Sequence, residues 1–369
     1  MKKKIIFCCP WERNRNRSWS GTHFNVYSSL MKYYNVKEID IGDNRPYTII
    51  YKLLRKFKLV KNDMGIKKDI HYNKKINKMF KKLNVKNIPC IQFNECPNNI
   101  TNIDSYIYID LCVDFLYEAA KNNSKLYKYC GIPNLTLEGL EKRSVIQNNF
   151  FKECKGIFTM GNWMAEYLSK IGIEDSKIHP IGGGFNVLPP LSLECNKKTD
   201  TKILFVGKDF YRKGGDLVCE AFQILLNKMP NAELHIAGPT SLPEEFLKCN
   251  NIYFYGEINY DKVQELYNKC DIFVMPSRFE AYGLVFIEAL SYGLPCIGKN
   301  DFEMPYFIED NVTGKLINGE DCISLAESMY ELLNNKTYKQ NVVIRHEEYI
   351  SKYSWDSVVK RMVEVIDNN

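Results

Sequence analysis

The sequence has no long hydrophobic run. None of its apolar segments approaches the ~18–20 residues that cross a bilayer, and the basic start of the chain is followed by only a short apolar stub. We therefore expect neither a membrane span nor a signal peptide. The 13 cysteines stand singly except for Cys8 and Cys9, and no C-x-x-C pair occurs. Because zinc sites and secreted disulfide frameworks use regularly spaced cysteines, this pattern predicts reduced thiols in a cytoplasmic protein.

Two common phosphate-binding signatures are also missing. The sequence contains neither the Walker loop G-x-x-x-x-G-K-[ST] nor the dinucleotide fingerprint G-x-G-x-x-G. Apolar residues make up 45% of the chain, and 24 tyrosines and 20 phenylalanines exclude a disordered or low-complexity protein. At ~150 residues per domain, the 369 residues predict two globular domains.

Positive charge is concentrated in one stretch. From Arg45 to Cys90 there are 14 Lys and Arg side chains against Asp63 and Asp69, a net charge of +12 in a chain whose total is +6. Helical spacing of apolar residues predicts two basic amphipathic helices here, with faces formed by Ile50, Leu53, Leu54 and Phe57 and by Tyr72, Ile76, Met79, Phe80 and Leu83. Such helices either pack on a domain surface or bind an anionic membrane, at about 1 kcal/mol per basic residue. No nucleic-acid recognition motif accompanies the charge, so nucleic acid is not expected as a partner.

Short apolar strands alternate with helices in the first half of the chain. Strands are expected at 4–9, 88–93, 106–109 and 156–160. The first leads through the loop Ser20-Gly21-Thr22 into a helix, and the last leads into a helix from Trp163 to Ile171. This alternation predicts a parallel sheet that is covered by helices on both faces.

The alternation begins again after a polar, proline-containing stretch. Residues 186–201 have the composition of a linker. Beyond them, strands are expected at 202–206, 233–237, 252–255, 271–275 and 295–298. We therefore predict two Rossmann-like α/β domains, at 1–187 and 188–350. An amphipathic helix in 351–369 could pack on either domain near their junction.

Two permanent cations follow the first strand of the second domain. Gly207 ends that strand, and Arg212 and Lys213 precede the next helix. A glycine at a strand end lets a ligand approach the backbone, and α/β proteins bind ligands at the carboxyl edge of the sheet. The arrangement suits a phosphate, although such a basic pair can also lie on a solvated turn.

A second string, PSRFEAYGLVFIEALSYGLP at 276–295, has a carboxylate at each end of a short interval. Glu280 lies in the turn after a strand, a helix opens near Gly283, and Glu288 follows on that helix. The helix opening offers free N–H groups and the positive end of the helix dipole, which suit a diphosphate. Glu280 can therefore lie at the sheet edge while Glu288 accepts hydrogen bonds deeper along the helix.

These strings resemble the retaining glycosyltransferases of family four. That family has the GT-B fold, in which two Rossmann-like domains face each other across a cleft. The likeness covers most of the chain and is most specific in FVGKDFYRKGG at 205–215 and in the 276–295 string, which is similar to the family's Glu-x7-Glu signature. Supporting matches lie at 160–186, 255–258 and 311–317.

The resemblance implies catalytic and donor-binding roles for the matching residues. Arg212 and Lys213 would grip the diphosphate of a nucleotide sugar, Glu280 would contact the donor sugar near its reacting face, and Glu288 would bind the ribose hydroxyls. The N–H groups of Gly283, Leu284 and Val285 would bind phosphate, and Gly21 would face the phosphates from the first domain. The base would lie near Gly256, Glu257 and Ile258. Gly207 would be a further donor-binding residue.

The acceptor side departs from the family pattern. Many relatives have a double glycine in the first-domain loop and a histidine in the acceptor domain. Here that loop contains only Gly21, and none of the five histidines falls in the matching stretch. Asp110, at the end of the strand 106–109, is the polar residue expected there, either as a catalytic residue that orients the acceptor hydroxyl or as a cap of the strand.

The resemblance implies transfer of a hexose, with retention, from a UDP- or GDP-sugar to a glycan or a lipid-linked acceptor. The product would be a cell-surface polysaccharide or glycolipid, made in the cytoplasm at the inner face of the cell membrane. The family's reaction needs no metal, and the sequence has no Asp-x-Asp pair, so we expect neither a metal nor another cofactor. A non-catalytic nucleotide-sugar-binding protein and a GT-B epimerase are the alternatives.

Overall fold

The computed structural model describes residues 2–42, 77–80, 87–93, 103–122, 125–130, 135–193 and 201–369. The chain forms two compact units. The first unit comprises Met1–Gly183 and Trp355–Asn369, and the second comprises Gly184–Ser354. Within the described residues, no helix is both long enough and apolar enough to span a membrane.

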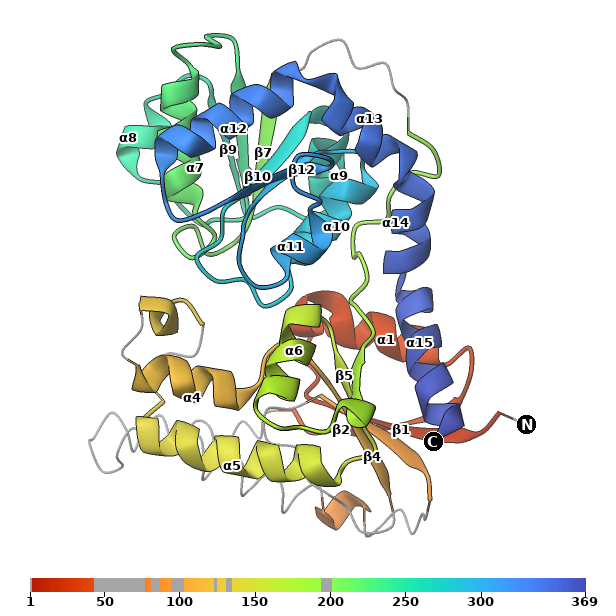
Figure 1. Cartoon of the computed structure of the whole chain (residues 1–369). Coiled ribbons are helices and arrows are strands. Elements are labelled where there is room, and N and C mark those ends of the chain that lie inside the picture. The colour runs from red at the N-terminus through yellow and green to blue at the C-terminus, as the bar shows by residue number, and fades with distance from the viewer. Residues whose placement is uncertain are drawn as a thin grey trace. The chain divides into compact units, whose positions relative to one another are not determined.

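The described part of the first unit contains a six-stranded parallel sheet in the order β2-β1-β3-β4-β5-β6 (Figure 1). Its strands are β1 (Lys4–Cys9), β2 (Asn35–Asp40), β3 (Pro89–Gln92), β4 (Asp104–Ile109), β5 (Gly156–Thr159) and β6 (Ile178–Pro180). Its α-helices with named bounds are α1 (Thr22–Leu30), α4 (Val113–Lys121), α5 (Leu137–Glu153), α6 (Asn162–Lys170) and α15 (Trp355–Asn368). Short 3-10 turns are η1 (Arg15–Gly21), η2 (Lys125–Lys128) and η3 (Asp175–Lys177).

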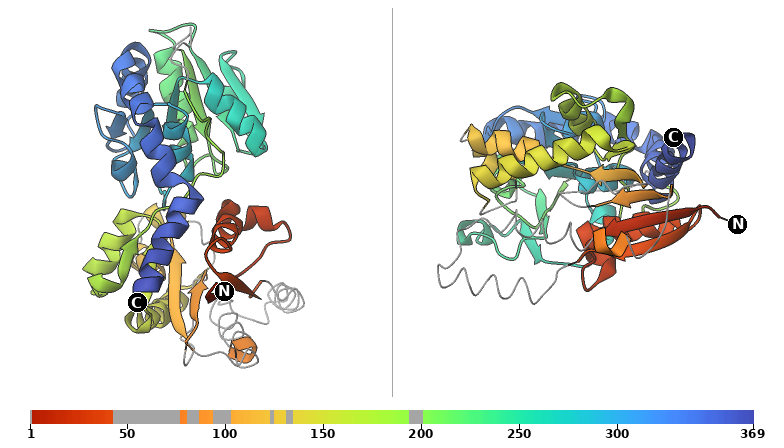
Figure 2. Two further views of the ribbon diagram at one scale, coloured as in Figure 1. Left: turned by 90° about the vertical axis from the view of Figure 1, so that its right-hand side faces the viewer. Right: turned by 90° about the horizontal axis from the view of Figure 1, so that it is seen from below.

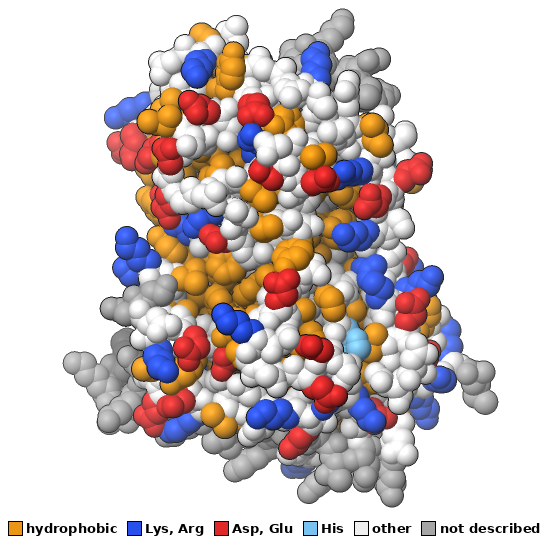
Figure 3. Space-filling model, viewed as in Figure 1, with side chains coloured by type: hydrophobic (Ala, Val, Ile, Leu, Met, Phe, Trp, Pro, Cys, Tyr) orange, Lys and Arg blue, Asp and Glu red, His pale blue; other side chains and the backbone are white. Residues whose placement is uncertain are grey.

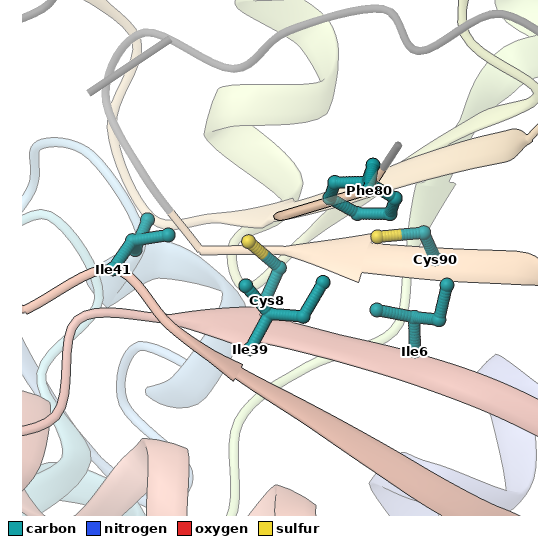
Figure 4. Packing of buried hydrophobic residues seen from close by; sticks show 6 residues of the cluster. All are labelled: Ile6, Cys8, Ile39, Ile41, Phe80 and Cys90. Atoms are coloured by element: carbon teal, nitrogen blue, oxygen red, sulfur yellow. The ribbon is translucent and has the colours of Figure 1, made fainter. Parts of the chain in front are cut away.

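A small part of the basic stretch is described, and it packs on the core of the first unit. Residues 77–80 are helical, and the Phe80 ring is buried against Ile6 and Cys8 of β1 and Cys90 of β3 (Figure 4). The apolar side of this turn therefore faces the core. This agrees with the interpretation that the basic helices pack on a domain surface. Most of the predicted basic helices between residues 45 and 90 lies outside the described residues.

Charges of both signs are interspersed over the described residues on the molecular face shown in Figure 3. No described segment of similar length contains as many Lys and Arg side chains as the 14 of residues 45–90. The prediction of a membrane-binding surface therefore still depends on the sequence of that stretch alone.

The C-terminal helix α15, for which the sequence left the domain open, belongs to the first unit. It lies beside α1 (Figure 1), where Asp356 accepts a hydrogen bond of 2.8 Å from Ser29 and pairs with Lys32 at 2.6 Å. Further along the helix, Arg361 Nε donates to the carbonyl of Ile181 at 2.8 Å. The units meet along the chain at 183/184 and 354/355, whereas the sequence analysis placed the boundaries at 187/188 and 350/351.

The second unit runs from green to blue in Figure 2. Its described part contains another six-stranded parallel sheet, in the order β12-β11-β10-β7-β8-β9. Its strands are β7 (Lys202–Val206), β8 (Glu233–Ala237), β9 (Ile252–Gly256), β10 (Ile272–Met275), β11 (Cys296–Lys299) and β12 (Gly314–Ile317). Its helices are α7 (Gly215–Leu225), α8 (Glu244–Leu247), α9 (Tyr260–Lys269), α10 (Leu284–Ser291), α11 (Met304–Phe307), α12 (Cys322–Asn334), α13 (Lys336–Ile344) and α14 (His346–Tyr353). The predicted two-domain α/β fold is thus confirmed.

Helices cover both faces of the second sheet. Helices α7 and α12 lie side by side on one face, and the ring of Phe205 points toward this face, where it meets Phe210. The ring of Phe273 points the other way and packs on Tyr267 of α9 and Phe286 of α10. Because each β-α-β crossover is right-handed, the helices change face where the strand order reverses, between β7 and β10.

Part of the predicted linker is packed on the second unit. Phe185 N donates to the carbonyl of Tyr353 at 3.0 Å, and an imidazole nitrogen of His346 lies 3.0 Å from the carbonyl of Pro190. Both partners belong to α14, so residues 184–190 are fastened to that helix. Residues 194–200 of the predicted linker lie outside the described part of the chain.

Candidate active site

The strand order of the second sheet places the predicted donor residues at its switch point. Starting from β9, the order is third, second, first, fourth, fifth and sixth strand of the unit. In such sheets the loops after the first and fourth strands leave in opposite directions and leave a crevice at the carboxyl edge, where ligands bind. Those loops are 207–214 after β7 and 276–283 after β10, and they contain the basic pair and Glu280.

These two loops approach each other so closely that a glycine is required. Gly214 has a φ of +75°, and a Cβ there would lie 2.4 Å from the carbonyl oxygen of Pro276. The loop after β8 comes equally near, because a Cβ on Gly238 would lie 2.8 Å from the carbonyl carbon of Gly207. Backbone atoms that follow three strand ends therefore approach one another closely at one edge of the sheet.

Lys213 and Glu280 form an ion pair at this edge. Lys213 Nζ donates to Glu280 Oε2, and the two side chains are 12% and 10% exposed. Burial lowers the pKa of the Lys213 ammonium well below its ordinary value, and the positive charge of Arg212 lowers it further. The two residues that the sequence named as phosphate grip and sugar contact are thus brought together across 67 residues of chain.

The Arg212 guanidinium is fixed to both loops. Its Nε donates to Asp209 at 3.3 Å within its own loop, and its Nη1 donates to the carbonyl of Phe279 at 3.1 Å in the other. About a quarter of the side chain remains exposed. The guanidinium therefore stays accessible to an anion while its position is set by the fold.

Helix α10 begins shortly after Glu280, the carboxylate of the ion pair. Gly283 is its N-cap residue, with a φ of +94°, and a Cβ there would lie 3.1 Å from Glu280 Cγ. The first N–H groups of a helix have no partner in the preceding turn, so Leu284 and Val285 present theirs at the positive end of the helix dipole. Positive charge and N–H donors are thus gathered around one carboxylate.

Glu288 lies further along α10 and is 4% exposed. Its Oε1 accepts hydrogen bonds from the backbone N–H groups of Asn186 at 2.9 Å and Val187 at 3.1 Å, and its Oε2 accepts one from the Tyr267 hydroxyl at 3.1 Å. Burial raises the pKa of the carboxyl to about 7, although these three hydrogen bonds lower it. The carboxyl fastens residues 186 and 187 to α10, and the predicted ribose contact would be made in addition to these bonds.

The residues predicted to surround the base follow β9. Gly256 has a φ of +65°, and its carbonyl accepts a hydrogen bond of 2.8 Å from Gly238 N. Glu257 is exposed and Ile258 is half-buried. The carboxyl ends of β7, β8 and β9 thus adjoin one another, with these two side chains at the outer strand.

Gly21 and Asp110 lie at the carboxyl edge of the first sheet, within the first unit. Gly21 has a φ of +94° and is the N-cap residue of α1, and it follows Trp19 and Ser20, whose φ angles are also positive. Asp110 comes directly after β4 and is half-buried, and its charge adds to the burial that raises the pKa of Tyr108 well above its ordinary value. Both residues therefore stand where the sequence analysis expected them along the first sheet.

The comparisons with known proteins match part of the chain to a family. Residues 194–353 match the family described as glycosyl transferases group 1. The likeness to this family is thus confined to the segment 194–353. A curated relative is an uncharacterized 41.2 kDa protein in the cps region of Klebsiella pneumoniae, 28% identical over 235 residues that cover 60% of each chain. Another is an uncharacterized glycosyltransferase of Methanocaldococcus jannaschii, 26% identical over 58% of this chain and 60% of that protein. The matched regions thus span about 60% of the length of these relatives.

The fold comparison extends over the whole chain. WaaG, a glycosyltransferase involved in lipopolysaccharide biosynthesis, superimposes with a TM-score of 0.65 at 16% identity, covering 99% of this chain and 100% of that one. This similarity shows that both units share the GT-B fold.

Two residues of the second unit were not assigned a role by the sequence analysis. Arg278 lies inside the quoted 276–295 string and joins three loops of the site. Tyr267, on α9, donates to Glu288. The spacing of apolar residues on α9 predicts that Tyr267 faces inward, but only the fold shows which carboxylate it meets.

Among the described residues, no three His, Cys, Asp or Glu side chains gather as metal ligands.

Proposed function

We propose that the protein is a retaining, metal-independent glycosyltransferase. It transfers a hexose from a UDP- or GDP-sugar to a glycan or a lipid-linked acceptor in the synthesis of cell-surface polysaccharide or glycolipid. The observation that carries the proposal is the Lys213–Glu280 pair, with Arg212 beside it, at the switch point of the second sheet and at the beginning of α10.

This arrangement suits the departure of a diphosphate. As the bond between the anomeric carbon and the diphosphate oxygen breaks, negative charge grows on the leaving group and positive charge grows on the sugar. Arg212, Lys213 and the first N–H groups of α10 stabilise the former, and the Glu280 carboxylate stabilises the latter. The acceptor oxygen forms its bond to the same face of the sugar, and its proton passes to the departing phosphate oxygen.

The paired state of Lys213 has a consequence for donor binding. In the free protein the Glu280 carboxylate holds the ammonium at the sheet edge, so the cation needs no reorganisation when a diphosphate arrives. Preorganised charge of this kind contributes more to a transition state than a mobile side chain does.

Two of the comparisons support a cell-surface product. The Klebsiella pneumoniae relative is encoded in a cps region, and WaaG is involved in lipopolysaccharide biosynthesis. We extend the proposal to an acceptor at the inner face of the cell membrane, where the net charge of +12 between residues 45 and 90 would meet anionic lipid. Charge reversal of Lys74, Lys75 and Lys78 is then expected to weaken binding to anionic vesicles without changing donor hydrolysis.

The test is turnover of UDP- and GDP-sugars by the purified protein with a panel of glycan and lipid-linked acceptors. We expect release of the nucleoside diphosphate with one base, loss of release in Lys213→Ala, and unchanged release in the surface control Lys262→Ala. The anomeric configuration of the product, read by NMR, tests retention, and activity in excess EDTA tests metal independence. Nucleotide-sugar binding without turnover in the presence of every acceptor would favour the non-catalytic alternative.

A further inference from the structure

Arg278 lies in the loop after β10 and its side chain is only 10% exposed. Its Nε and Nη2 both donate to Glu320, at 3.0 and 2.9 Å. Its Nη1 and Nη2 donate to the two carboxylate oxygens of Asp216, at 2.7 and 2.9 Å, and Nη1 also donates to the carbonyl of Tyr211 at 2.5 Å. A guanidinium has five N–H donors, and these five bonds use all of them.

The partners of Arg278 come from three different segments at the carboxyl edge. Tyr211 belongs to the loop after β7, Asp216 to the first turn of α7, and Glu320 to the segment between β12 and α12. One guanidinium therefore joins the ends of β7, β10 and β12. A bidentate arginine–carboxylate pair also fixes the relative orientation of the two groups, which a lysine cannot do.

The same two loops are joined at their backbones. Arg278 N donates to the carbonyl of Arg212 at 2.8 Å, and Arg212 Nη1 donates to the carbonyl of Phe279 at 3.1 Å. Lys213 and Glu280 each lie next to one of these bonded residues. A shift of one loop relative to the other would thus move the ion pair and Arg212 together.

Two carboxylates already compensate the charge of Arg278. Asp216 and Glu320 both accept from it, so its side chain offers neither an unused N–H group nor an uncompensated charge to a diphosphate. In this respect it differs from Arg212. Among the described residues, Arg212 pairs with one carboxylate, that of Asp209, at a longer distance of 3.3 Å, and its side chain is more exposed.

We propose that Arg278 is a positioning residue of the donor site, which holds Arg212 and Lys213 opposite Glu280 by fixing the loop after β7 to the loop after β10. The proposal rests on the proposed function in so far as it names the diphosphate as the group that these cations receive. It assigns Arg278 no contact with the donor.

Steady-state kinetics test the kinetic side of the proposal. Arg278→Gln and Asp216→Asn remove the two sides of one link, so each is expected to lower kcat at least about tenfold, as small misplacements of catalytic groups do. The KM for the donor should change by less than about threefold. Arg278→Lys should be impaired like Arg278→Gln, because the ammonium cannot make the bidentate pair. The control Arg345→Gln removes an arginine–carboxylate pair with Glu309 in the same unit and should keep the wild-type kcat.

Non-additivity is the decisive prediction. If Arg278 and Asp216 act through one link, the double variant Arg278→Gln/Asp216→Asn should be no slower than the worse single variant. A double variant whose losses multiply would overturn the proposal. So would wild-type kcat in Arg278→Lys, and so would a raised donor KM with unchanged kcat in Arg278→Gln, since these outcomes would make Arg278 a charge that binds the donor.

A second readout needs no activity. Lys213 is 12% exposed and Lys299, in the same unit, is 18% exposed. Modification of Lys213 by a small amine-reactive reagent, measured by mass spectrometry relative to Lys299, should become several-fold faster in Arg278→Gln and Asp216→Asn. If no sugar nucleotide is turned over but this acceleration is seen, the proposed function fails and the positioning role stands. If Arg278→Gln lowers Tm alone, with labelling and kcat unchanged, the positioning role is overturned.

Discussion

Glu288→Gln is expected to change how the stability of the second unit depends on pH. The Glu288 carboxyl is buried on α10, and its pKa is raised to about 7 from an ordinary value of 4.5. Between these two values the folded state keeps a proton that the unfolded state releases. The stabilisation that this proton brings is complete below about pH 4.5 and is lost as the pH rises to about 7, above which the dependence levels off.

The magnitude follows from the two pKa values. A separation from 4.5 to about 7 corresponds to ~3 kcal/mol, at about 1.4 kcal/mol per pKa unit. The glutamine variant cannot titrate. Its carbonyl oxygen can still accept from the N–H groups of Asn186 and Val187, and its amide can donate to the Tyr267 hydroxyl, which can turn its own proton to the carbonyl of Val285 at 3.3 Å. The stability of the variant relative to the wild type should therefore increase by ~3 kcal/mol across this window.

The assay is urea unfolding of both proteins at several pH values between about 4.5 and 8. All four tryptophans, Trp11, Trp19, Trp163 and Trp355, lie in the first unit. Tryptophan fluorescence therefore follows the first unit alone, whereas circular dichroism follows both. The effect should be seen in the circular dichroism transition.

The control and the refuting result use the same measurement. Glu265→Gln removes a carboxyl on α9 that is 63% exposed, and its difference from the wild type should hardly vary with pH. If the difference in unfolding free energy between Glu288→Gln and the wild type is equally independent of pH, then folding does not raise the pKa of Glu288. The burial argument would then be wrong.

Three further substitutions test individual contacts. Glu280→Ala should abolish transfer with an unchanged circular dichroism spectrum, and wild-type rates would refute its assignment to the site. Gly283→Ala adds a Cβ 3.1 Å from Glu280 Cγ at a φ of +94°, so it should destabilise the unit by more than the about 1–2 kcal/mol that the left-handed backbone alone costs, and it should slow transfer. Gly319→Ala is the control for backbone strain without crowding, because Gly319 has a φ of +74° and a Cβ there would meet no other atom within 4 Å. Equal losses of unfolding free energy in the two variants, measured by urea unfolding, would contradict the crowding argument. Tyr267→Phe removes a hydrogen bond to Glu288 and should cost about 1 kcal/mol in urea unfolding at about pH 8, where an unchanged midpoint would show that the bond contributes nothing.

Most of the fold could be predicted because the central strands of parallel sheets are buried on both faces. They appear in the sequence as short apolar runs, such as KILFV in β7 and IFVM in β10. The three strands that the sequence analysis missed are β2, β6 and β12, and each lies at an edge of its sheet. Edge strands are half exposed and often carry charges. Strand β2 has the sequence NVKEID with a single buried residue, so its pattern does not differ from that of a loop.

The candidate site was predictable as a set of residues rather than as a set of contacts. Local spacing placed Glu280 before a helix and the basic pair after a strand, since both are properties of a strand–turn–helix segment. Nothing local indicates that Lys213, and not Arg212, meets Glu280. That choice depends on β7 and β10 being neighbours in the sheet.

Arg278 shows why the remaining contacts could not be predicted. Its five bonds go to residues that lie between 42 and 67 positions away in the sequence, and they exist only because the ends of three strands leave the sheet at one edge. The same closeness requires glycine at position 214, where a Cβ would collide with the carbonyl of Pro276. Gly214 allows the two loops to approach each other, and Arg278 binds one loop to the other. Both residues therefore determine the distance between the two loops. Because the ion pair of Lys213 and Glu280 joins the two loops, substitutions at position 214 or 278 should alter the candidate site without touching a ligand.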